Sequence, residues 1–267
     1  MVTKKLVACF DIINGRVTKA KNFFDNIDVA PAAEFAAAIC EQQIDELIFF
    51  DVTASAEKRK IDIETVKKVA GKISGFSVPL MVGGGIRDLD DMDEVFKAGA
   101  DKISVDSMAV RNPQIIADGA KSFGSQRIVL STQVKFVGVS EKIPSGYEVA
   151  IDGARVFTGM DALEWVKRGE DLGAGEICVN SIGRDGTCSG FDLYITGRAA
   201  ELVSVPVTAS GGAGTPEHLK DVFTQTKARA AIISSMLYSP RLDKNYEVRE
   251  LKEYLISAGI NVIPMRV

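Results

Sequence analysis

Short apolar runs alternate along the chain with stretches in which apolar residues recur every three or four positions. The first pattern is typical of strands buried on both faces of a parallel sheet, and the second of amphipathic helices. The expected strands cover residues 6–10, 46–51, 80–82, 102–105, 127–131, 176–180, 207–209 and 230–234. The expected helices include residues 31–42, 63–73, 112–124, 161–171 and 248–257. Strand and helix therefore alternate from one end of the chain to the other.

One segment of this pattern occurs twice. Residues 78–108 read VPLMVGGGIRDLDDMDEVFKAGADKISVDSM, and residues 205–236 read VPVTASGGAGTPEHLKDVFTQTKARAAIISSM. The copies are displaced by 127 residues at their Val-Pro pairs and by 128 at their Ser-Met pairs. Each copy contains a strand, a glycine turn, a helix and a second strand, which together make a βαβ unit. We interpret the two segments as an internal repeat.

The repeat extends toward the N-terminal side of this unit in both halves of the chain. Residues 45–51 match residues 175–181, and residues 6–11 match residues 128–133. Four strands per half, each followed by a helix, make eight strands. A length of 267 residues with 46% hydrophobic content suits one eight-stranded barrel. We therefore predict a single (β/α)8 TIM barrel over residues 1–267, built from two half-barrels.

Glycines stand between a strand and a helix at matching positions of the two copies, at Gly83-Gly84-Gly85 and at Gly211-Gly212. Such glycines let backbone N–H groups approach a ligand closely, and the positive end of the following helix favours an anion. The alternative is that the glycines only form tight turns. Two copies in register favour a phosphate site at each turn. The expected ligand is then elongated, with a phosphate at each end.

Polar residues at the carboxyl ends of barrel strands face the active site. Asp11, Asp51 and Asp185 are carboxylates at such ends or in the turn that follows. In the repeat Asp11 matches Gln133, and only the carboxylate of these two can transfer a proton near neutral pH. The mouth of the barrel is therefore expected to hold one acid where a symmetric design would hold two.

In each half of the chain, one connection follows the first strand. Residues 14–22 are basic and are expected to form a mobile loop, in which Lys19 or Lys21 could close over an anion. A solvated loop without a ligand is the alternative. In the second half, residues 136–158 are expected to contain an exposed, hairpin-like insert.

Four charged residues stand at the opposite, N-terminal ends of strands. They are Lys5, Glu46, Lys102 and Glu176. Two residues of each sign could form a closed ring of ion pairs at the bottom of the barrel. From these residues alone, a structural plug is the favoured interpretation.

Composition limits the classes of function. A net charge of -4 gives no electrostatic basis for binding nucleic acid or an anionic membrane. The four cysteines lack CxxC spacing, and His218 is the only histidine, so we expect no metal site and no cofactor. His218 is interpreted as a surface residue. The N-terminus shows no signal peptide, and together with the cysteine pattern this favours a cytoplasmic location.

Several motifs are shared with a known family. They include Ala8-Cys9-Phe10-Asp11, Val82-Gly83-Gly84-Gly85-Ile86, Arg184-Asp185-Gly186-Thr187 and Ala209-Ser210-Gly211-Gly212-Ala213-Gly214. Through them the chain resembles the cyclase subunits of imidazole glycerol phosphate synthase, across essentially its whole length. The resemblance implies a barrel of histidine biosynthesis that receives ammonia from a glutaminase docked at its N-terminal face. The ammonia would be added to a bisphosphorylated ribulosyl aminoimidazole carboxamide, releasing imidazole glycerol phosphate and an aminoimidazole carboxamide ribotide.

The resemblance also implies roles for individual residues. Asp11 would be one of two catalytic carboxylates, and Lys19 would be the lysine of a mobile loop. The two phosphate sites would contain Gly85 and Ser107 on one side, and Gly186, Gly212, Ser234 and Ser235 on the other. We expect the substrate-binding set to include also Asp51, Asp106, Gln133, Asp185 and Gly211. The four charged residues at the barrel bottom would admit ammonia, which favours a functional role over a plug.

The chain departs from the family at four positions. Gln133 stands where the family has its second catalytic aspartate, and losing a general acid or base costs about 10²- to 10⁴-fold in rate, or about 3 to 5 kcal/mol of barrier. Asp106 replaces an asparagine beside the first phosphate and so places like charge near the anion. Gly183 replaces an aspartate, and Asn180 a threonine.

Three hypotheses are compatible with these residues. The leading one is a cyclase that uses Asp11 and is slowed by Gln133 or rerouted through Asp185 or Asp51. The second is a non-cyclising paralogue that binds a glutaminase and passes ammonia to another acceptor, such as a surface sugar. The third is the related sugar-phosphate isomerase on the same half-barrel plan, which needs two acids and lacks the charged bottom, and it ranks last.

Overall fold

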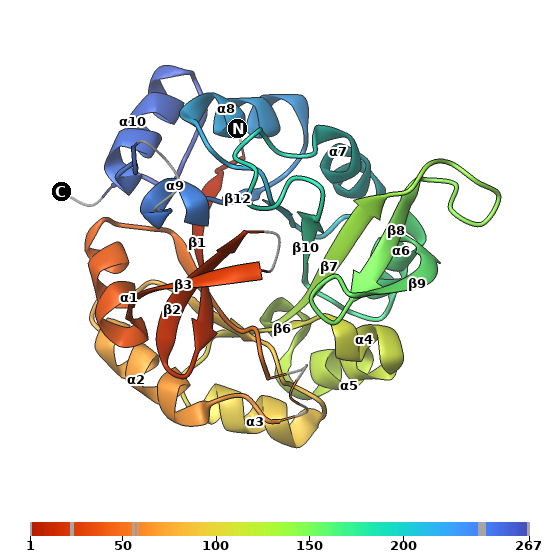
Figure 1. Ribbon diagram of the computed structural model, residues 1–267, viewed down its shortest axis with the longest axis horizontal. Coiled ribbons are helices and arrows are strands. Elements are labelled where there is room, and N and C mark those ends of the chain that lie inside the picture. The colour runs from red at the N-terminus through yellow and green to blue at the C-terminus, as the bar shows by residue number, and fades with distance from the viewer. Residues whose placement is uncertain (1, 22–23, 55–56, 58, 240–243, 266–267) are drawn as a thin grey trace.

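The computed structural model describes residues 2–21, 24–54, 57, 59–239 and 244–265. Eight parallel strands pair side by side and close into a barrel (Figure 1). They are β1 (Lys5–Ile13), β4 (Glu46–Asp51), β5 (Leu80–Gly83), β6 (Lys102–Val105), β7 (Ile128–Phe136), β10 (Glu176–Ser181), β11 (Val207–Ser210) and β12 (Ala230–Ile232). The strands follow one another around the barrel in this order, and β12 pairs with β1 to complete it. The predicted (β/α)8 fold is confirmed.

Helices surround the barrel and lie in the connections between its strands (Figure 1). The longer ones are α1 (Ala32–Glu41), α2 (Ile63–Ile73), α3 (Leu89–Lys97), α5 (Gln114–Phe123), α6 (Ala162–Asp171), α7 (Leu193–Leu202), α8 (Pro216–Gln225) and α10 (Val248–Ser257). Two short helices, α4 (Ser107–Arg111) and α9 (Ser234–Tyr238), stand just after β6 and β12. Within the described residues, no helix has the length and apolar character needed to cross a bilayer.

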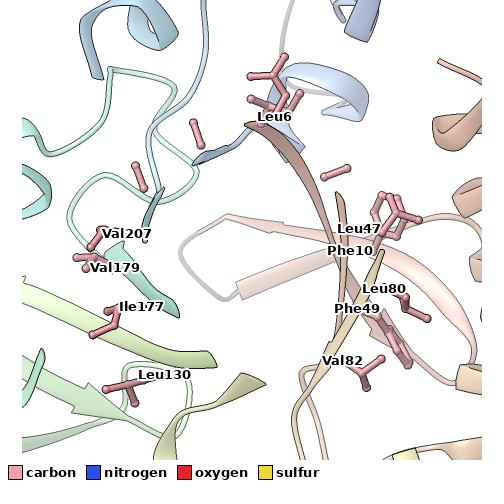
Figure 2. Close-up of a cluster of buried hydrophobic side chains, with 14 of the residues drawn as sticks. Leu6, Phe10, Leu47, Phe49, Leu80, Val82, Leu130, Ile177, Val179 and Val207 are labelled. Atoms are coloured by element: carbon pink, nitrogen blue, oxygen red, sulfur yellow. The ribbon is translucent and has the colours of Figure 1, made fainter. Parts of the chain in front are cut away.

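Side chains alternate between the two faces of the barrel wall. One set packs against the helices and includes Leu6, Phe10, Leu47, Phe49, Leu80, Val82, Leu130, Ile177, Val179 and Val207 (Figure 2). The other set forms a separate cluster inside the barrel and includes Val7, Ile48, Met81, Val129, Cys178, Ala230 and Ile232. Because successive side chains of a strand point to opposite faces, the position of a residue in this alternation shows which face it occupies.

Each half-barrel begins with a long strand that continues into an antiparallel pair. β1 leads into β2 (Arg16–Lys21) and β3 (Phe24–Pro31), and β7 leads into β8 (Tyr147–Ile151) and β9 (Val156–Asp161). The hairpin expected in the second half is therefore confirmed. The expectation that residues 14–22 form a loop was wrong, since Arg16–Lys21 is a strand that pairs with both β1 and β3. Residues 22 and 23 lie outside the described part of the chain.

Two side chains show how the helices are held. Trp165 of α6 is buried in the core, 1% exposed. His218 is half-buried, whereas a surface residue was expected. Its Nδ1 accepts a hydrogen bond from the Thr215 backbone N–H at 3.2 Å. This bond is one side of a capping box that begins α8.

The end of the chain is tied to its beginning beneath the barrel wall. Lys252 of α10 lies 2.6 Å from Asp45 Oδ1, and each of these side chains is 1% exposed. Lys252 also donates to the Gln43 carbonyl at 2.8 Å, and Asp45 Oδ2 accepts from the Leu6 backbone N–H at 2.8 Å. A single buried ion pair therefore joins the last helix to the connection between α1 and β4 and to the first strand.

Candidate active site

A cavity of about 270 Å³ opens at the carboxyl ends of the barrel strands. Most of the residues proposed for the site line it: Asp11, Asp51, Gly85, Asp106, Ser107, Gln133, Asp185, Gly211, Gly212, Ser234 and Ser235. Gly186 lies in the same turn as Asp185 but does not line the cavity. Lys19 belongs to β2, and its side chain lies outside what the structure describes. Residues from both halves thus meet around one space.

The glycine turns present one face to the cavity and pack their other face against backbone. Gly84 has φ +88°, and a Cβ there would meet the Asp51 carbonyl oxygen at 2.3 Å. Gly212 has φ +104°, and a Cβ there would meet the Gly190 carbonyl oxygen at 2.1 Å. Only glycine satisfies both the conformation and the contact. The two turns therefore hold matching positions on opposite halves of the wall.

Asp11 and Gln133 occupy equivalent places on the first strands of the two halves. Each follows the inward alternation of its strand, in which Cys9 precedes Asp11 and Ser131 precedes Gln133 along the cavity wall. Each is also held by an antiparallel neighbour, since Asp11 pairs with Thr18 and Gln133 with Ala150. The hairpins that follow these strands therefore fix the backbone at both positions.

Asp51 is engaged in a structural contact. Its two carboxylate oxygens lie 2.6 Å and 2.7 Å from the two terminal nitrogens of Arg59, a bidentate geometry. The same carboxylate accepts backbone N–H bonds from Ala54 and Asp62. The hydrogen bond to Asp51 raises the pKa of Arg59 above its ordinary value. Asp51 is therefore committed to shaping the connection between β4 and α2, although it lines the cavity.

Asp106 and Gln133 contact each other at the ends of adjacent strands. Gln133 Nε2 donates to Asp106 Oδ2 at 2.7 Å. Asp106 Oδ1 and Gln133 Oε1 are buried and have no hydrogen-bond partner among the described residues. Burial raises the pKa of Asp106 to about 7, and the hydrogen bond from Gln133 only partly opposes this. A buried carboxyl near the first glycine turn is thus poised to change its protonation state around neutral pH.

Two serines of the site use their hydroxyl groups to fix neighbouring backbone. Ser107 Oγ accepts from the Asp152 N–H at 2.9 Å, which joins α4 to the β8–β9 turn. Ser234 Oγ accepts from the Cys9 N–H at 2.9 Å and donates to the Cys9 carbonyl at 2.6 Å. Both serines line the cavity, Ser107 just after β6 and Ser234 just after β12.

The charged residues at the barrel bottom meet in an ordered chain of contacts. Lys5 Nζ lies 3.3 Å from Glu46, and Lys102 Nζ lies 2.8 Å from Glu46 and 2.7 Å from Glu176. Glu176 also accepts from the Thr208 hydroxyl at 2.7 Å. In the described structure these contacts form an open chain with Thr208 at one end, and not the closed ring that was expected. We call Lys5, Glu46, Lys102 and Glu176 the bottom cluster.

Lys102 keeps its charge although it lies largely inside the barrel. Burial disfavours the ammonium ion, but the attraction of Glu176 and Glu46 exceeds this penalty, so the pKa of Lys102 is raised. Lys102 is the inward-facing residue that begins β6, and two positions further along the same face is Ser104. Ser104 Oγ lies 2.6 Å from Ser131 Oγ on β7, and both serines line the floor of the cavity. Between the bottom cluster and the cavity, the barrel interior therefore holds these two serines together with the apolar cluster of Val7, Ile48, Met81 and Val129.

Sequence reasoning did not propose several of the residues on the cavity wall, and three of them carry polar groups at the mouth of the barrel: Arg155, Asn180 and Ser210. Arg155 is the last residue of the turn between β8 and β9 and is the only arginine on the described wall. Asn180 and Ser210, at the ends of β10 and β11, share a hydrogen bond of 2.9 Å. Arg155 could have been noticed as a basic residue in the insert, but its reach to the cavity depends on how the hairpin folds back. Asn180 and Ser210 could have been found from their places at strand ends.

A closed barrel of two matching halves, with one cavity flanked by a glycine turn from each half, defines a (β/α)8 protein suited to a small elongated ligand. Comparison with known proteins identifies the family. The family model described as "Histidine biosynthesis protein" matches residues 5–243. The chain belongs to this family, and within it to the HisF subunits of imidazole glycerol phosphate synthase.

Individual relatives cover almost the whole chain. The HisF subunit of imidazole glycerol phosphate synthase from Desulfatibacillum aliphaticivorans is 48% identical over 262 residues, 98% of each chain. The subunits of the same name from Syntrophobacter fumaroxidans and Desulfosudis oleivorans are 47% and 46% identical, also over 98% of each chain. The similarity therefore extends over both half-barrels.

Proposed function

We propose that the protein is a cyclase of histidine biosynthesis, a carbon-nitrogen lyase that uses ammonia. Its substrate is a bisphosphorylated ribulosyl aminoimidazole carboxamide, and its products are imidazole glycerol phosphate and an aminoimidazole carboxamide ribotide. The observation that carries the proposal is the shared cavity, in which glycine turns from the two halves face one space that Asp11 also lines. The HisF relatives, which bear the name of this synthase, support it.

The two phosphates are assigned to the two halves of the wall. Gly85 and Ser107 would bind one, and Gly212, Ser234 and Ser235 the other. Exposed backbone N–H groups at glycine turns suit phosphate oxygens. Gly186 and Lys19 are kept as further members of the binding set on the strength of the family resemblance, and Gly211 and Asp185 complete the second side.

Asp11 would transfer protons in the reaction. It projects from the end of β1 into the cavity between the two glycine turns. A positioned carboxylate typically contributes about 10²- to 10⁴-fold to the rate. Gln133 at the matching place cannot replace such a group, because a neutral amide has no titratable proton near neutral pH.

Ammonia would enter from the bottom. A glutaminase subunit docked at the N-terminal face of the barrel would deliver it, and the name "subunit" of the HisF relatives supports such a partner. The bottom cluster would then control admission, and the small polar residues Ser104 and Ser131 would lie on the route to the cavity.

The experiment is turnover of the bisphosphate by the purified chain with an ammonium salt as nitrogen source. We expect both products to form without any partner, and we expect Asp11→Asn to lower kcat about 10²- to 10⁴-fold with the substrate still bound in calorimetry. Failure of the wild-type chain and of a Gln133→Asp variant to turn over the substrate would reject the proposal.

A second function is favoured by one observation, the joint change to Asp106 and Gln133 while the bottom cluster is kept. In that case the chain would bind a glutaminase and pass ammonia to another acceptor, such as a surface sugar. Co-purification with a glutaminase, combined with no heat of binding for the bisphosphate, would support it. Micromolar affinity for the bisphosphate would count against it.

A further inference from the structure

Asp106 is a carboxyl group on the cavity wall, and it forms no salt bridge in the described structure. Asp51 is paired with Arg59, whereas Asp106 has Gln133 as its hydrogen-bond partner. The second oxygen of Asp106 is buried without a partner. A permanently ionised carboxylate would be costly in such a place, and a carboxyl that alternates between its neutral and charged forms fits it.

The charged groups around Asp106 come from three neighbouring elements. Asp152, in the β8–β9 turn, opposes ionisation, and Arg111 of α4 favours it, but these two residues form an ion pair with each other. Cys178 of β10 lies close enough to interact, and burial raises the pKa of its thiol to about 12, so it stays neutral at pH 7. Burial is therefore the dominant influence on Asp106, with its pKa raised to about 7.

Asp106 also has a favourable place relative to Asp11. Around the barrel the order is β1, β4, β5, β6 and β7, so Asp106, just after β6, stands three strands from β1. Its side chain bonds the residue of β7 that corresponds to Asp11 in the repeat. The carboxyl group thus sits beside the position that the repeat pairs with Asp11, and it lines the same cavity.

We propose that Asp106 is the second proton-transferring acid of the cyclisation, and that Gln133 positions it. This inference rests on the proposed function. It places the second acid just after β6, beside β7, which is the strand on which the family has its second catalytic aspartate. Gln133 then keeps a role without titrating, since its amide can donate to the ionised form of Asp106 or accept from the protonated form.

The proton balance is simple. When ammonia adds to the ribulosyl carbonyl, a C–N bond forms and one proton passes from the nitrogen to the carbonyl oxygen, which becomes a hydroxyl. Asp106 gives its proton to that hydroxyl, which leaves as water as the C–O bond breaks and the nitrogen lone pair forms a C=N bond. Asp106 regains a proton from this positively charged nitrogen, and a neutral imine remains. No oxidant, reductant or further reactant is required.

The test compares four forms of the whole chain with the bisphosphate and ammonium chloride: wild type, Asp106→Asn, Gln133→Asp, and the exchange variant Asp106→Asn/Gln133→Asp. We expect Asp106→Asn to lower kcat about 10²- to 10⁴-fold while the calorimetric Kd changes less than about threefold. We expect the exchange variant to recover kcat to within about tenfold of wild type. Asp90→Asn, on the exposed face of α3, is the matched control and should behave as wild type.

The pH profile gives a second readout that a structural role would not produce. With rates expressed per free ammonia, kcat of wild type should fall as the pH rises through about 7, because Asp106 then loses the proton it donates. The Asp106→Asn variant should not show this fall in kcat. Two outcomes would overturn this inference and leave the proposed function standing. One is a kcat of Asp106→Asn within threefold of wild type. The other is an inactive wild type together with an active Gln133→Asp variant. Inactivity of all four forms would overturn the proposed function itself.

Discussion

Lys252 and Asp45 show how much a single buried ion pair can contribute to stability. Their ion pair has an N···O distance of 2.6 Å with both side chains 1% exposed. Replacing Lys252 with Met leaves the Asp45 carboxylate buried without its cation, a situation that typically costs about 3–5 kcal/mol. We expect the free energy of unfolding, measured by urea denaturation, to fall by that amount. Lys67→Met, which breaks the exposed pair with Glu64, is the control and should change it by less than about 0.5 kcal/mol.

Single residues also show where sequence reasoning succeeds and where it stops. Asp11 could be placed at the site because it ends an apolar run that reads as a buried strand, and strand ends face one side of a parallel barrel. The bond between Asp106 and Gln133 could not be foreseen, because it depends on the register between β6 and β7 and on the burial of both groups. The same holds for Arg59, whose contact with Asp51 depends on how the β4–α2 connection folds.

At the scale of elements, the glycine turns can be tested directly. Gly84→Ala places a Cβ against the Asp51 carbonyl oxygen at 2.3 Å in a left-handed conformation, so we expect a loss of at least about 2 kcal/mol in stability and weaker bisphosphate binding. Gly71→Ala, in α2, is the matched control. A Cβ there meets nothing within 4 Å, and the change should stabilise the protein by about 0.4–1 kcal/mol. Equal effects of the two substitutions would contradict this account of the turn.

The end of α6 is anchored by a carboxylate whose protonation should affect stability. The Ser204 hydroxyl and the Ser204 backbone N–H each donate a hydrogen bond of 2.6 Å to Glu170 Oε1. These bonds lower the pKa of Glu170 to about 2. The unfolded value is about 4.3, so the contribution is complete above about pH 5 and is lost as the pH falls toward 2. Wild type should therefore exceed Glu170→Gln in free energy of unfolding at pH 7, and the difference should shrink across that range. A difference that does not change with pH would contradict the assignment.

The sequence predicted the barrel strands but not the strand Arg16–Lys21, for a physical reason. The barrel strands have apolar side chains on both faces and are recognisable from sequence alone. Arg16–Lys21 has no such run, and it forms a strand because β1 offers it hydrogen-bonding partners, with Ile12 opposite Val17. A local pattern cannot report a partner that lies elsewhere in the fold, so this segment was interpreted as a loop.

For the molecule as a whole, the bottom cluster and the cavity lie at opposite ends of the barrel. In the proposed function this arrangement would separate the delivery of ammonia from its use. Lys102→Met removes the cation between Glu46 and Glu176 without touching the cavity wall. We expect glutamine-driven turnover with the glutaminase to fall more than ammonium-driven turnover, measured as the ratio of the two kcat values. Lys97→Met on the exposed side of α3 should leave that ratio unchanged. An equal fall in both activities would place the effect of Lys102 in general stability.

The pairing of β12 with β1 and the ion pair of Lys252 with Asp45 have a consequence for how the molecule is made. A ribosome releases the first strand early, yet its outer edge has no neighbour until residues 230–232 emerge, and Asp45 has no counter-ion until α10 follows. An unpaired strand edge invites association with other chains. The nascent chain therefore carries an open edge until residues 230–232 have been made and can pair with β1.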